Sequence, residues 1–134
     1  MIKKVALLFL LILVMPIINS EIYGHSFTTD ESVLYLTLVD KLKAHAKLIE
    51  QFILENNYES AIQHSKLLKQ IYTKEINDEI EEKNKRISNE ISSFINAFSS
   101  LRSDNMNQSQ ITNTVQDFEA VLDESISVRI LKMF

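Results

Sequence analysis

The chain has 134 residues, of which 46% are hydrophobic and 24% are charged, and it contains no cysteine. This is the composition of a globular domain, and it excludes a disulfide framework, a zinc-thiolate site and a cysteine nucleophile. Lys3 and Lys4 are the only charged residues before Glu21, so the rest of the chain carries 12 basic and 18 acidic residues. This negative balance argues against nucleic-acid binding, which needs a basic surface to displace counterions from the phosphates.

The first 20 residues have the layout of a secretory signal. Two lysines precede an apolar run over residues 5–18, which contains the single proline of the chain. This run is shorter than the roughly 20 residues that a membrane-spanning helix needs, and it fits the hydrophobic region of a signal peptide. We expect cleavage after Ser20 or Gly24, with an uncleaved N-terminal anchor as the alternative. Either outcome places the protein outside the cytoplasm, secreted or at the extracytoplasmic face of a membrane that only residues 1–20 would contact.

Residues 21–29 are polar and aperiodic, which predicts a linker before a domain over residues 30–134. Thr28-Thr29-Asp30-Glu31 has the pattern of a capping box at the start of a helix. We predict a first helix at about residues 30–55, ending where Asn56-Asn57 can adopt the left-handed geometry of a helix end. Its apolar positions recur at helical spacing: Leu34, Leu38, Leu42, Ile49 and Phe52.

A second apolar pattern starts at Tyr58 and continues to Leu101. An unbroken helix of that length would extend roughly 65 Å, far beyond its first partner, so we expect a bend or break within residues 73–85, where charge is densest. Residues 99–109 read as a loop, and the pattern after it predicts a last helix over residues 109–132. Short connections favour antiparallel neighbours, so the sequence predicts an all-α, up-and-down three- or four-helix bundle built on a long helical hairpin.

The C-terminal end, Ile130 to Phe134, is mostly apolar and has no polar stop signal. Two interpretations follow from this pattern. The domain is truncated at its C-terminus, or the apolar helix edge is a surface for a protein partner or for self-association.

His45 and His64 are the candidates for a functional site. Each lies in an apolar helical row, one on each helix of the predicted hairpin, so the two side chains should face each other's helix, offset by about one helical turn. Two alternatives stay open for them. Each imidazole is hydrogen-bonded to a neighbour within the bundle, or the two share a transition metal ion completed by Asp40, Glu59 or a carboxylate of the third helix. No other cofactor is expected.

Enzyme activity is not expected from this chain. The sequence has no H-E-x-x-H pattern, no Glu-x-x-His pattern of di-iron bundles and no G-x-S-x-G nucleophile turn. A glycine-rich phosphate loop is excluded because the chain has a single glycine. Asn107-Gln108-Ser109 is an N-glycosylation acceptor motif within the predicted loop.

The stretch Lys43-Ala44-His45-Ala46-Lys47-Leu48-Ile49-Glu50, followed by Asn57-Tyr58-Glu59-Ser60-Ala61-Ile62-Gln63-His64, resembles helical extracytoplasmic domains of archaeal exported proteins. Related helical pairs accompany iron permeases, and the resemblance covers roughly residues 33–80. His45 and His64 match histidine positions of that family, whereas Leu67-Leu68 stands where a further His-Pro is expected.

The resemblance implies metal handling. We therefore expect an exported helical binding or structural module, a helper in metal uptake or an envelope-associated interaction protein, with a metal-binding protein using His45 and His64 as the alternative. The family's chains usually continue past the last predicted helix, which agrees with truncation at the C-terminus.

Overall fold

The computed structural model describes residues 31–102 and 107–131, with side chains up to residue 128. Of these residues, 36–102 and 107–131 belong to one compact unit, and residues 31–35 belong to another. The predicted signal peptide and linker, residues 28–30 of the predicted capping box, and residues 132–134 of the predicted apolar edge lie outside the described residues.

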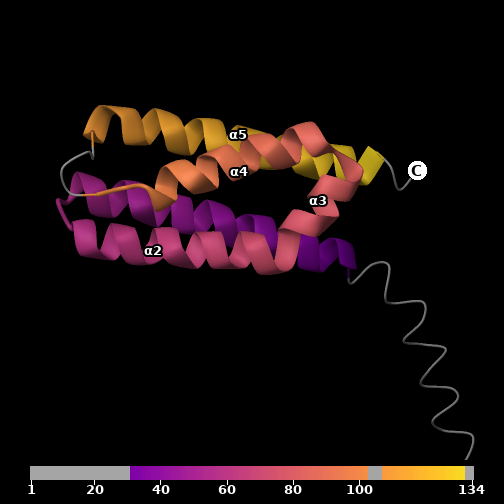
Figure 1. Cartoon of the computed structure of the whole chain (residues 1–134), viewed down its shortest axis with the longest axis horizontal. Helices are drawn as coiled ribbons and strands as arrows, with labels where there is room; N and C mark the ends of the chain where they lie inside the picture. Colours follow the sequence, from indigo (N-terminus) through magenta and orange to yellow (C-terminus); the bar gives the residue numbers. More distant parts are fainter. Residues whose placement is uncertain (1–30, 103–106, 132–134) are drawn as a thin grey trace, which may run out of the picture. The chain divides into compact units, whose positions relative to one another are not determined.

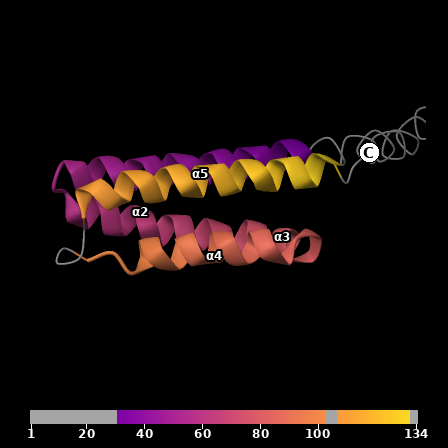
Figure 2. The ribbon, with the colours of Figure 1, turned by 90° about the horizontal axis from the view of Figure 1, so that it is seen from above.

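Within its described part the unit is an all-α, up-and-down bundle, as the sequence predicts (Figure 1). The first helix covers residues 31–54 and forms an antiparallel hairpin with the helix that follows. In the second view, α5 runs beside the first helix and α4 beside α2 (Figure 2). The remaining elements, in chain order, are α2 (Tyr58–Ile71), the π-helical segment η1 (Tyr72–Ile76), α3 (Asn77–Lys83), α4 (Lys85–Ser99) and α5 (Gln108–Leu131). In the described ranges, no helix is both long and apolar enough to cross a membrane.

Two asparagines make the turn of the first hairpin. Asn56 has a positive φ of 59°, and its N–H donates to the carbonyl of Ile53 at 3.1 Å. The N–H of Asn57 donates to the carbonyl of Phe52 at 2.7 Å, which completes the Schellman pattern of a helix end. The Asn57 side chain then caps α2 by accepting from the N–H of Ser60 at 3.3 Å. The predicted helix end at these two asparagines is confirmed.

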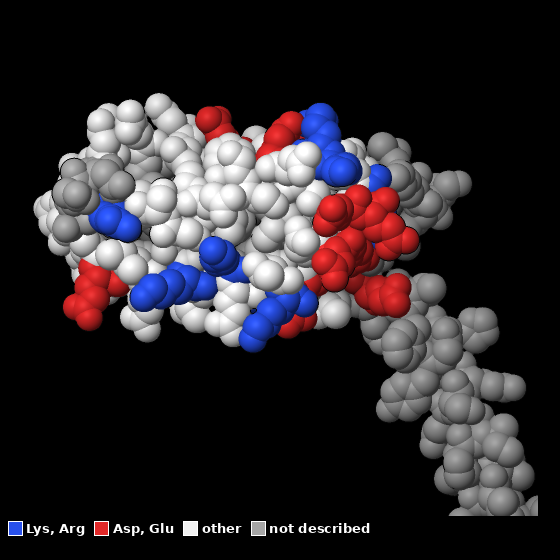
Figure 3. All heavy atoms as spheres, in the orientation of Figure 1, with Lys and Arg blue, Asp and Glu red and all other residues white. Residues whose placement is uncertain are grey.

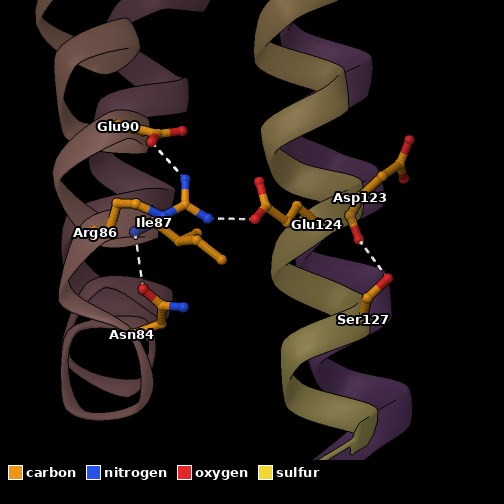
Figure 4. A network of polar contacts seen from close by, with 7 residues as sticks. All are labelled: Asn84, Arg86, Ile87, Glu90, Asp123, Glu124 and Ser127. Carbon is orange, nitrogen blue, oxygen red and sulfur yellow. Dashed lines mark hydrogen bonds and ion pairs between the residues drawn. The ribbon is translucent and has the colours of Figure 1, made fainter.

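The break predicted within residues 73–85 occurs at Asn84, whose backbone is extended (φ −156°, ψ 95°). Its N–H donates to the carbonyl of Ile80 at 2.7 Å and closes α3. Its side-chain oxygen accepts from the N–H of Ile87 at 3.2 Å and opens α4 (Figure 4). One asparagine therefore ends one helix and starts the next.

Ion pairs connect α5 to both of its neighbours. Arg86 of α4 pairs with Glu90 of its own helix at 2.5 Å and with Glu124 of α5 (Figure 4). Lys43 of the first helix pairs with Asp123 of α5. Such pairs at the surface are screened by solvent, so they orient the helices more than they stabilise the fold.

The core consists of rows of buried side chains that meet between the helices. Phe98 of α4 and Phe118 of α5 are buried and meet edge to face, with ring centroids 5.4 Å apart. In the first hairpin, two small side chains, Ala46 and Ser65, are almost fully buried. The buried row of the first helix is Val39, Leu42, Ala46, Ile49 and Ile53.

The π-helical segment keeps the second helix facing the core. Buried side chains recur every four residues at Leu68, Tyr72, Ile76 and Ile80. Repeated steps of four drift around an α-helix, which has 3.6 residues per turn. The wider turn of a π-helix takes up this drift, so Tyr72 and Ile76 both stay buried.

Tyr72 also carries the polar contact that links this segment to α4. Its hydroxyl donates to the carbonyl of Ser88 at 3.2 Å and lies 3.3 Å from the hydroxyl of Ser92. The ring is 3% exposed, so the hydroxyl depends on these partners in place of water. The contact joins helix segments on the two sides of Asn84.

Tyr72→Phe is therefore expected to lower the free energy of unfolding by about 1–2 kcal/mol, because a buried hydrogen bond is lost and its partners keep their desolvation cost. Tyr58→Phe is the matched control, since it removes an exposed hydroxyl that donates to Asn56 at 3.0 Å. We expect the control to change stability by less than about 0.5 kcal/mol. Urea unfolding of both variants tests this, and equal effects would contradict it.

Candidate functional site

The structure brings His45 of the first helix and His64 of α2 into direct contact. Their Nδ1 atoms are 2.9 Å apart, the ring centroids are 5.1 Å apart and the ring planes are inclined at 39°. The prediction that the two side chains face each other is confirmed.

The histidines lie beside the core rows and not within them. Each is half-buried and is followed by a small buried residue, Ala46 on the first helix and Ser65 on α2. Ser65 satisfies its own hydroxyl by donating to the carbonyl of Ile62 at 2.8 Å. Small side chains between facing helices let the backbones approach, so the flanking imidazoles can meet. The buried residue is therefore Ala46 in place of His45 and Ser65 in place of His64, whereas Leu42 and Leu68 of the predicted rows are buried as predicted.

Phe52 is a further contact of the pair that the sequence pattern did not predict. Its ring stacks on His64, with centroids 5.3 Å apart and planes inclined at 23°. Phe52 follows His45 by seven residues, which places both on one side of the first helix. That spacing could have predicted the contact, because a residue two turns from a histidine faces the same neighbouring helix.

The close Nδ1 contact determines how the pair carries its protons. A hydrogen bond between two ring nitrogens needs one N–H donor and one lone pair, so in a pair of neutral imidazoles one ring carries its proton on Nδ1 and the other on Nε2. Burial lowers the pKa of His45 from the ordinary 6.5, and the neighbouring His64 and Lys41 lower it further. The arrangement therefore favours a neutral imidazole at position 45.

The carboxylates that were expected to complete a metal site do not join the pair. Within residues 31–102 and 107–131, no three His, Asp or Glu side chains are grouped closely enough to hold a metal ion. The prediction that Asp40, Glu59 or a third-helix carboxylate supplies a further ligand is wrong for this part of the chain. His25, the remaining histidine, lies outside the described residues.

Other surface features are separate from the histidine pair. A cavity of about 90 Å³ is bordered by the apolar side chains of Ile53, Phe98 and Ile111, and neither histidine lines it. On the face seen in Figure 3, acidic side chains gather over α3, which contains Asp78, Glu79, Glu81 and Glu82. Basic side chains lie along α2 in the same view.

Comparison of the chain with protein-family models, with curated proteins and with solved structures found no match in any of the three. The resemblance to extracytoplasmic domains that accompany iron permeases therefore stays a prediction.

The lowered pKa of His45 predicts a pH-dependent stability of the metal-free protein. Between about pH 6.5 and the lower pKa that His45 has in the folded protein, the unfolded chain binds a proton at position 45 more readily than the folded chain. Stability should therefore be retained above pH 6.5 and fall as the pH decreases through this window. The variant His45→Gln should remove this dependence of stability on pH, and Lys41→Gln should make it smaller. Thermal unfolding between about pH 7.5 and 5 measures this, and an unchanged slope in His45→Gln would contradict it.

Proposed function

We propose that this protein is an exported helical-bundle module that binds a transition metal ion between His45 and His64. The observation that carries the proposal is the 2.9 Å separation of the two Nδ1 atoms, contributed by two different helices. Neutral imidazole nitrogens suit zinc, copper and nickel. The lowered pKa of His45 favours the neutral form that a ligand must have.

The separation of the nitrogens agrees with two ligands on one ion. Metal–imidazole bonds of about 2.0–2.1 Å place neighbouring ligands roughly 2.8–3.4 Å apart in square-planar or tetrahedral geometry. The pair needs only one tautomer change to bind, because moving the shared proton from Nδ1 to Nε2 frees both Nδ1 lone pairs. Large movements of the two helices are not required.

The surroundings of the pair favour a transiently held ion. Stacking of Phe52 on His64 restrains one ligand ring, which lowers the entropy lost on binding. Both imidazoles are half-buried, and two protein ligands leave the other coordination positions to water or to a partner's groups. An ion held in this way can be transferred, which supports a role as a helper in metal uptake.

A second candidate function, an envelope-associated interaction module, is favoured by exposed leucines. Leu36, Leu54 and Leu67 are 40%, 48% and 38% exposed. Leu67 follows His64 by three residues and therefore lies on the same side of α2. A protein partner that covers Leu67 would also reach the histidine pair.

Zinc, copper or nickel is expected to raise the melting temperature of the folded chain. At a free metal concentration of about 100 times the dissociation constant, binding to the native state alone contributes about 2.7 kcal/mol. For a domain of this size the shift should be roughly 5–15 °C. His45→Ala and His64→Ala should each abolish it.

Gln63→Ala is the matched control, because it changes an exposed α2 residue next to His64 and should leave the shift intact. His25→Ala should also keep it. A melting temperature that does not respond to any of the three ions, or a shift that survives the double variant His45→Ala/His64→Ala, would rule out the metal site. Calorimetric titration of the same variants gives the stoichiometry, expected to be one ion per chain.

A further inference from the structure

The motif Asn107-Gln108-Ser109 has no part in the histidine site. It is the single Asn-x-Ser/Thr sequence of the chain in which x is not proline. The structure places it at the start of α5, with all three residues exposed. The motif is therefore accessible from solvent.

Local hydrogen bonds fix the orientation of the Asn107 amide. Ser109 donates twice to the side-chain Oδ1 of Asn107, from its N–H at 3.0 Å and from its hydroxyl at 2.8 Å. The Asn107 carbonyl accepts from the N–H groups of Gln110 and Ile111 at 3.2 and 3.1 Å. Both oxygens of Asn107 thus face α5, so Nδ2, on the other arm of the planar amide, points away from the helix end.

Gln108 anchors this helix start to the first hairpin. Its side-chain amide donates to the carbonyl of Ile53 and to the side chain of Asn56, both at 3.4 Å. The central residue of the motif therefore faces the protein, which keeps the flanking Asn107 and Ser109 at the surface.

We propose that Asn107 is an N-glycosylation site. The donor would be a glycan linked through phosphate to a membrane lipid. Nδ2 forms a bond to the anomeric carbon of the first sugar, the bond from that carbon to the phosphate oxygen breaks, and Nδ2 loses one proton while the lipid phosphate leaves. The inference depends on the export that forms part of the proposed function, because N-x-S/T acceptors are modified in exported chains.

The modification is compatible with the folded helix. The glycan occupies Nδ2, whereas the cap of α5 uses Oδ1, so one amide serves both roles. No hydrogen bond to Nδ2 is formed by the described residues. The other capping asparagines, Asn57 and Asn84, are followed two positions later by Glu59 and Arg86, so neither forms the motif.

The test expresses the full chain in a eukaryotic secretory host, with a C-terminal tag that carries a known acceptor motif as a reporter of export. Two glycans per chain are expected by mass spectrometry, one on the tag and one on Asn107. Peptide N-glycosidase should remove both and convert Asn107 to aspartate. Asn107→Asp and Ser109→Ala should each lose one glycan, and Ser109→Thr should keep both.

Asn107→Asp retains an oxygen at the cap position, so its secretion should match that of the unmodified sequence. A chain glycosylated on the tag but not at Asn107 overturns the inference and leaves export intact. A chain glycosylated at neither position shows that export itself fails, which overturns the inference together with that part of the proposed function. Retention of both glycans in Ser109→Ala also overturns it. The metal titration is independent of all these outcomes.

Discussion

Each reversal of the described bundle depends on the side chain of an asparagine. Asn57, Asn84 and Asn107 accept hydrogen bonds from N–H groups in the first turns of α2, α4 and α5. The chain has no glycine or proline after Gly24, so the residues that most often end helices are absent from these turns. Asparagine replaces them because its short amide caps a helix start and tolerates the left-handed backbone of a helix end. The spacing of these residues sets the lengths of the helices.

The histidine pair is a consequence of this spacing. The turn at Asn56 and Asn57 sets the register in which the first helix and α2 lie side by side. A change of one residue in either helix would rotate a histidine by about 100° and separate the two rings. Ala46 and Ser65 then decide how closely the helices approach. The site is therefore built by the turn and the small core residues as much as by the imidazoles.

One of these asparagines, Asn107, is both a helix cap and the proposed site of modification. Asn107 is a helix cap whose second arm faces solvent, so a modification there leaves the bundle unchanged. At the histidine pair, by contrast, a bound metal ion must replace the hydrogen bond between His45 and His64. We therefore expect the pair to respond to pH and to metal ions, whereas the Asn107 site responds only to the compartment.

The sequence by itself determined the all-α class, the C-terminal end of the first helix, the break before residue 85 and the facing of His45 and His64, because helical periodicity and asparagine caps are local properties. Tertiary structure decided the rest. The buried rows include Ala46 and Ser65 in place of the predicted His45 and His64, because packing selects small residues where helices approach most closely. Three features depend on helix register and distance, which no local pattern specifies: the contact of the rings, the stacking of Phe52, and the lack of a third ligand grouped with the pair among the described residues.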